Sequence, residues 1–123
     1  MTSIPRAFLI GEALAFGTAA LVHRGVLADG YQHRNAFIAE TIITAVLVAG
    51  LVAGWLAPRR AWAAAVAAQA FALVATSVGI VTIAVGVGPR TVPDVVYHLV
   101  IVAVLTWGLV VALRGPAGAT ARD

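Results

Sequence analysis

A carboxylate and an imidazole stand four residues apart in the last apolar segment of this sequence, and another apolar segment holds a second carboxylate. At this spacing Asp94 and His98 project from one side of a helix, and Glu40 meets them if the two helices face each other. Carboxylate and imidazole together suit Zn, Fe, Mn or Cu(II), and the loop before Glu40 offers His33 or His23 as a further ligand. These five residues form a candidate metal or ligand site.

The pattern agrees only in part with cofactor sites of helical bundles. Di-iron carboxylate bundles take Glu-x-x-His from two helices, whereas here the spacing is four and the helix of Glu40 carries no histidine. A haem needs an axial imidazole, which His98 or His23 can supply, although no deeply placed pair of imidazoles is evident. A metal ion or a haem is therefore one interpretation, and the cofactor stays open.

Asp94 also has a structural interpretation, which we favour. The run Thr91-Val92-Pro93-Asp94 fits a capping box, in which Thr91 is the N-cap residue and the Asp94 carboxylate reaches back to its amide. Arg90, just before the cap, is expected to reach a head-group phosphate or to pair with Asp94 or Glu40. The capping box alone can thus explain the Asp94 carboxylate.

The histidines have structural interpretations as well. His98 can donate to a carbonyl or to Glu40 inside a bundle. We give this structural role the same weight as a functional role. His23 and His33 belong to a loop that we expect to lie in water, where a histidine needs no special role. The sequence therefore points to His98 and its partner as the residues to examine first.

Glu12 is a carboxylate several turns from either end of the first apolar segment. Placing it there costs on the order of 2 to 3 kcal/mol unless it is neutralised or hydrated, which favours a functional or proton-linked role. At ~1.5 Å per residue, Glu12 and Gln69 share a depth and can hydrogen-bond, with Thr106 as a third member. Four short spans in about this length, with this one carboxylate in the first, resemble the small multidrug resistance exporters. The resemblance implies an antiparallel dimer that exchanges protons for cationic drugs at Glu12.

The elements that must position these residues are apolar throughout. Only 11% of the 123 residues are charged and 62% are hydrophobic, and the mean hydropathy is +1.00. About 20 helical residues cross a hydrocarbon core of ~30 Å, and four segments reach that length. We therefore predict an all-α integral membrane protein, an up-down-up-down bundle of four transmembrane helices within a single domain of residues 1–114. The predicted spans are about 5–26, 36–57, 61–87 and 92–113, and a disordered polar tail follows at 115–123.

Arginines set the expected orientation. The side that holds the N-terminus collects five of them and the opposite side three, which favours two cytoplasmic termini and argues against dual topology. We expect the cell membrane, specifically a bacterial inner membrane, as the location. The two sets are Arg6, Arg59, Arg60, Arg114 and Arg122, and opposite them Arg24, Arg34 and Arg90.

The remaining patterns favour a non-enzymatic protein. The chain has no cysteine, phosphate loop, HExxH or dinucleotide fingerprint, and no basic run that would bind nucleic acid. The GxxxG of Gly50 and Gly54 indicates close helix packing, within the bundle in preference to a homo-oligomer or another membrane protein. We expect an accessory or ligand-binding bundle in the lipid bilayer, with a polar cluster near its outer face. Metal or haem binding and proton-coupled transport remain the alternatives.

Overall fold

The computed structural model describes residues 3–115 and is all-helical. Its elements are α1 (Ser3–Arg24), α2 (Arg34–Leu56), the short 3-10 helix η1 (Pro58–Arg60), α3 (Ala61–Ala84) and α4 (Val92–Arg114). The four α-helices are long and apolar enough to cross a membrane, as predicted. Of the predicted tail, all but Gly115 lies outside the described residues.

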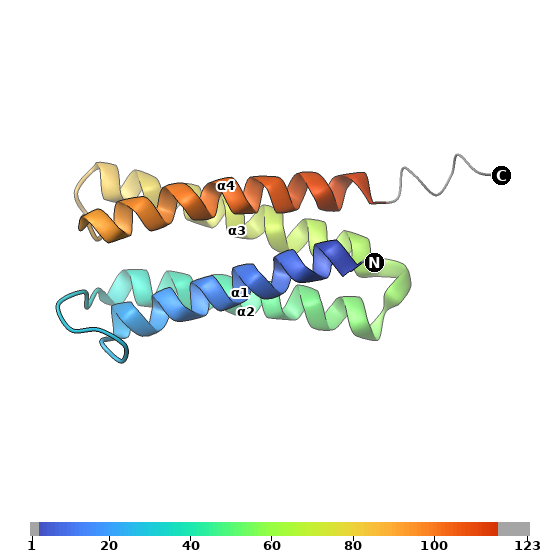
Figure 1. Ribbon diagram of the computed structural model, residues 1–123, viewed down its shortest axis with the longest axis horizontal. Helices are drawn as coiled ribbons and strands as arrows, with labels where there is room; N and C mark the ends of the chain where they lie inside the picture. The colour runs from blue at the N-terminus through green and yellow to red at the C-terminus, as the bar shows by residue number, and fades with distance from the viewer. Residues whose placement is uncertain (1–2, 116–123) are drawn as a thin grey trace.

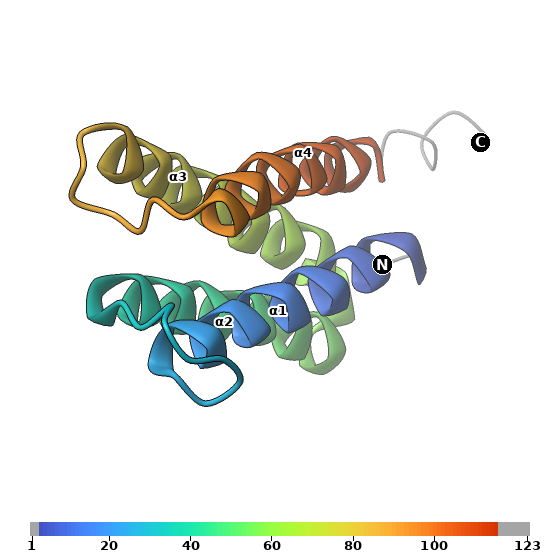
Figure 2. The ribbon, with the colours of Figure 1, turned by 60° about the vertical axis from the view of Figure 1, so that its left-hand side comes forward.

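The helices form two hairpins, α1 with α2 and α3 with α4 (Figure 1). Figure 2 shows the two hairpins as two layers stacked on each other. The α1–α2 and α3–α4 loops lie at the same end of the molecule, which we call the loop end. The α2–α3 turn and the start of α1 lie at the opposite end, called the turn end (Figure 1).

Two glycines end helices earlier than predicted. Gly25 and Gly86 have φ of 82° and 84°, in the left-handed region that other residues avoid. Each follows the last turn of a helix, so that α1 ends at Arg24 and α3 at Ala84, short of the predicted 26 and 87. The chain then turns back at the loop end, and α4 begins at the predicted capping box.

Small residues allow the helices to approach closely inside the bundle. A Cβ placed on Gly50 of α2 would lie 2.6 Å from the Cβ of Ala68 on α3, so only glycine fits there. Gly54 is buried as well. The GxxxG motif therefore packs within this chain, as preferred from the sequence. Around it lies a core whose largest members are Leu9, Phe16, Leu47 and Leu105.

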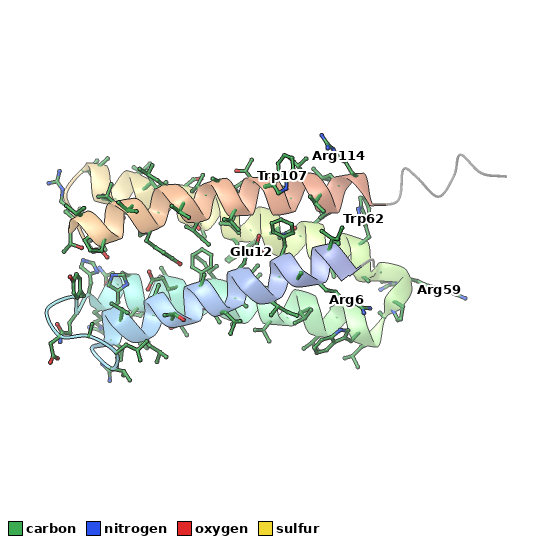
Figure 3. All side chains as sticks on the ribbon, in the orientation of Figure 1. Arg6, Glu12, Arg59, Trp62, Trp107 and Arg114 are labelled. Carbon is green, nitrogen blue, oxygen red and sulfur yellow. The ribbon has the colours of Figure 1, made fainter. Side chains whose placement is uncertain are left out.

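The outward surface of the helices is apolar over most of its length. Large hydrophobic side chains such as Leu14, Val74 and Leu99 are more than half exposed. Arg6, Arg59 and Arg114 lie toward the turn end, together with Trp62 and Trp107, while Glu12 lies inside the bundle (Figure 3). An exposed apolar belt bounded by arginines and tryptophans is typical of helices that cross a bilayer.

Candidate functional site

His23 connects two carboxylates at the loop end. Its Nδ1 lies 2.7 Å from Oε2 of Glu40 on α2, and its Nε2 lies 3.0 Å from Oδ1 of Asp94 on α4. The ring is 4% exposed. The prediction that His23 lies in water is wrong, because His23 lies on the buried face of the last turn of α1, where it contacts Glu40 and Asp94. We call these three residues the His23 cluster.

Asp94 both caps α4 and contacts His23, so it has the structural role and the cluster role that the sequence left as alternatives. One carboxylate oxygen, Oδ1, contacts His23, while Oδ2 accepts from the Thr91 amide at 3.2 Å and from the Thr91 hydroxyl. The Thr91 hydroxyl oxygen in turn accepts from the Asp94 amide at 3.3 Å. The predicted capping box is confirmed, and its carboxylate also belongs to the His23 cluster because a carboxylate has two oxygens to share.

Only one of the two carboxylate oxygens of Glu40 takes part in a hydrogen bond within the described part of the chain. Oε2 contacts His23, but Oε1 is buried and has no hydrogen-bond partner among the described residues. The Glu40 side chain is itself 5% exposed. A buried polar atom without a partner is uncommon and costs about 1–3 kcal/mol, more when charged. Oε1 is therefore the atom of the cluster that most needs an additional donor.

With one hydrogen in each of its two bridges and none on Glu40 Oε1, the His23 cluster carries one net negative charge. Each of its two bridges holds one hydrogen, whether that hydrogen is bonded to nitrogen or to oxygen. Two carboxylates and an imidazole without ring hydrogens carry three negative charges, of which the two bridging hydrogens compensate two. Among residues 3–115 no arginine forms an ion pair, so none neutralises the remaining charge.

Arg90 does not take the protein partners predicted for it. It is exposed and pairs with neither Asp94 nor Glu40. Its guanidinium instead lies over Gly86, where Nη1 would be 3.1 Å from an added Cβ. The reason is that the capping box turns the Asp94 carboxylate inward, away from the exposed chain before α4.

His98 is not part of the His23 cluster. Its Nδ1 donates to the carbonyl oxygen of Asp94 at 2.7 Å, one of the structural roles predicted for it. The predicted hydrogen bond between His98 and Glu40 is absent: Glu40 directs Oε2 to His23, and His98 directs Nδ1 to the Asp94 carbonyl. His98 and Glu40 nevertheless line the same cavity of about 190 Å³. We call it the Glu40 cavity.

The Glu40 cavity lies at the loop end between α2, α3, the α3–α4 loop and α4. On the other side of the His23 cluster, a groove of about 700 Å³ runs between α1 and α4 and is lined by His23, Asp94 and Tyr97. The cluster thus separates two hollows, and Glu40 faces the smaller one. Apolar side chains form most of the cavity wall, among them Phe16, Ile43, Val78 and Val87.

The predicted metal ligands do not assemble into a metal site. Within residues 3–115, no group of three or more His, Asp or Glu side chains is placed to hold a metal ion. Both nitrogens of His23 are already occupied by carboxylates. His33 caps α2, where its Nδ1 accepts from the Ala36 amide at 3.2 Å, and its ring stands edge-on to that of His23 at 6.4 Å.

A second polar pair lies deeper in the bundle. Gln69 Nε2 on α3 donates to both carboxylate oxygens of Glu12 on α1, at 3.1 Å each, as the shared depth predicted. Both side chains are buried. Thr106 does not join them: it is exposed, and its hydroxyl donates to the Val102 carbonyl at 2.7 Å. The step of two residues from Thr106 to Gly108 turns a helix by about 200°, which places Thr106 on the far side.

Gly108 makes room for this pair and was not singled out from the sequence. A Cβ at this position would lie 2.6 Å from Glu12 Oε1, and closer still to Gln69 Nε2. For the loop end, the missed signal was helical periodicity: Phe16, Ala20 and His23 follow one another on the buried face of α1.

Comparisons with models of protein families, with curated proteins and with solved structures give no match for this chain.

Proposed function

We propose that this chain is a non-enzymatic integral membrane protein that binds a small ligand in the Glu40 cavity. The single observation that carries the proposal is the buried oxygen Oε1 of Glu40, which lacks a partner and belongs to a residue that lines the cavity. A ligand that donates a hydrogen bond to Oε1 satisfies it. The non-enzymatic part is supported by the bonding of His23, whose two nitrogens are both engaged with carboxylates and so are not free to act as a base.

The proposed setting is the cell membrane, with the helices crossing in alternating directions and both termini in the cytoplasm. The exposed apolar belt supports insertion, and the arginines at the turn end support this orientation. The loop end with the Glu40 cavity then lies at the outer face. Lipid is the partner that the exposed belt requires.

Cysteine labelling tests this topology, because the chain has no cysteine of its own. Asp29→Cys places a thiol in the α1–α2 loop, and Arg59→Cys places one in the α2–α3 turn. In intact cells a membrane-impermeant maleimide should label the first and not the second, and both after lysis. Labelling of Arg59→Cys in intact cells would reverse the orientation, and partial labelling of both would indicate dual topology.

Ligand binding is tested by thermal protection of the purified protein in nanodiscs against a library that contains cationic, neutral and anionic small molecules. A Cβ on Gly79 would lie 3.5 Å from His98 Nε2, so Gly79→Leu should fill the Glu40 cavity. Gly11→Leu is the matched control, since its Cβ meets nothing within 4 Å. A true ligand should protect the wild type and Gly11→Leu but not Gly79→Leu. A library without any such compound would contradict the proposal.

Proton-coupled transport is a second candidate, favoured by one observation. Glu12, besides its bond to Gln69, lines a groove of about 390 Å³ that involves α1 and α4. A substrate that reached this groove would meet a carboxylate. Growth assays with cationic drugs, with Glu12→Gln as the control, test this candidate, and resistance that does not depend on Glu12 would dismiss it.

A further inference from the structure

The Glu40 cavity has the electrostatic character of a cation site. The His23 cluster carries one negative charge that no arginine pairs with among the described residues, and its free acceptor is Glu40 Oε1. Inside an apolar bundle such a charge is poorly screened, so a cation beside it is stabilised and an anion is repelled. The hydrogen-bond pattern of the His23 cluster therefore favours a positively charged ligand.

Two further polar side chains of the cavity wall, His98 and Thr82, offer acceptors. His98 donates through Nδ1 to a carbonyl, so the neutral form of its ring presents the lone pair of Nε2. Thr82 donates to the Gly79 carbonyl at 2.6 Å, which leaves only its lone pairs free. His33 and Asn35, from the start of α2, add groups able to donate. An ammonium group has several N–H donors and can satisfy Glu40 Oε1 together with a second acceptor.

The wall and the volume distinguish an organic cation from a metal ion. Apolar side chains make up most of the wall, and no group of metal ligands is present among residues 3–115. The cavity of about 190 Å³ is below the ~300–1,000 Å³ of pockets for drug-sized molecules, and corresponds to about six water molecules at ~30 Å³ each. It therefore suits a small amine with a short hydrocarbon body.

We propose that the ligand of the Glu40 cavity is a small organic monocation, an alkyl- or cycloalkylammonium ion, held by Glu40 Oε1 with His98 Nε2 as a second acceptor. This inference rests on the proposed function and adds the chemical class of the ligand. The hydrocarbon body of the amine contacts Phe16, Ile43 and Val78, while the charge faces the His23 cluster.

The test compares cyclohexylammonium with cyclohexanol, which has nearly the same size and shape but no charge, by calorimetric titration of the nanodisc-embedded protein. We expect the amine to bind the wild type in a saturable way and at least tenfold more tightly than the alcohol. Glu40→Gln keeps an oxygen for His23 and should weaken the amine at least tenfold. Asp29→Asn removes an exposed carboxylate from the α1–α2 loop, at the same end, and should not.

The inference is overturned if amine and alcohol bind equally to the wild type, or if the amine binds Glu40→Gln as tightly as the wild type. The first comparison needs no variant, so it decides even if Glu40→Gln does not fold. Absence of amine binding also overturns it. If a neutral or anionic library compound then still protects in a manner that Gly79→Leu abolishes, the proposed ligand-binding function survives and only the ligand class is wrong.

Discussion

Nε2 of His23 lies 3.0 Å from Oδ1 of Asp94, across 71 residues of sequence. This contact joins the first hairpin to the second at the loop end, and the contact of Nδ1 with Glu40 closes the link within the first hairpin. One buried imidazole therefore links the two hairpins beside the Glu40 cavity.

Replacing His23 should cost far more stability than replacing His98. His23→Ala leaves two buried carboxylates facing each other without their shared partner, and loss of one member of a buried charged pair typically costs about 3–5 kcal/mol. His98→Ala removes one hydrogen bond to a carbonyl, about 1 kcal/mol. Denaturant unfolding of the purified variants in mixed micelles measures both. Equal losses would mean that His23 does not hold the hairpins together.

Loss of the N-cap of α4 alone should cost less stability than loss of this cap together with the contact between Asp94 and His23. Thr91→Ala loses the N-cap bonds to Asp94 and should destabilise the protein by about 1 kcal/mol. Asp94→Ala loses the cap and also leaves His23 Nε2 without its partner. Its loss of unfolding free energy should therefore clearly exceed that of Thr91→Ala. Unfolding free energies of the two variants give the comparison, and a similar cost for both would reduce Asp94 to a cap.

Gly108→Ala should destabilise the protein through the Glu12–Gln69 pair. The added Cβ would lie 2.6 Å from Glu12 Oε1, and such overpacking costs about 1–3 kcal/mol. The control Gly11→Ala, whose Cβ meets nothing, should be neutral or stabilise α1 by about 0.5–1 kcal/mol. Combining Gly108→Ala with Gln69→Ala should give less than the sum of the two costs. Strict additivity would show that Gly108 does not make room for the pair.

Glu12→Gln and Glu12→Ala separate a packing role from a titrating one. Glutamine keeps an acceptor for the Gln69 amide, so the fold should lose less than about 1 kcal/mol, whereas alanine strands that amide and should cost about 1–3 kcal/mol. Thermal unfolding measures the two. If Glu12→Gln is as folded as the wild type but abolishes a cellular function of the protein, the carboxylate itself is required, and the transport candidate gains.

Gly50→Ala tests where the GxxxG motif acts. Its Cβ would lie 2.6 Å from that of Ala68 in the same chain, which should force α2 and α3 apart and cost about 1–3 kcal/mol. The oligomeric state in detergent, measured by light scattering, should not change. A shift in oligomeric state without loss of monomer stability would instead identify Gly50 as part of an interface between copies.

The sequence by itself determined the class of this protein and its local elements. Hydropathy over about 20 residues places each long helix, and the Thr91–Asp94 cap follows from side-chain chemistry that needs no distant partner. Even the Glu12–Gln69 bond could be predicted, because α1 and α3 both begin at the turn end and the depth of a residue along each helix follows from the rise per residue.

Only the tertiary structure decided which residues meet at the loop end. Helices without a polar face give little constraint on their rotation, so the sequence could not tell that His23 faces inward and takes the place predicted for His98. The same rotation sets Gly108 against Glu12 and turns Thr106 away. Packing between small residues selects that rotation, and it depends on all four helices at once.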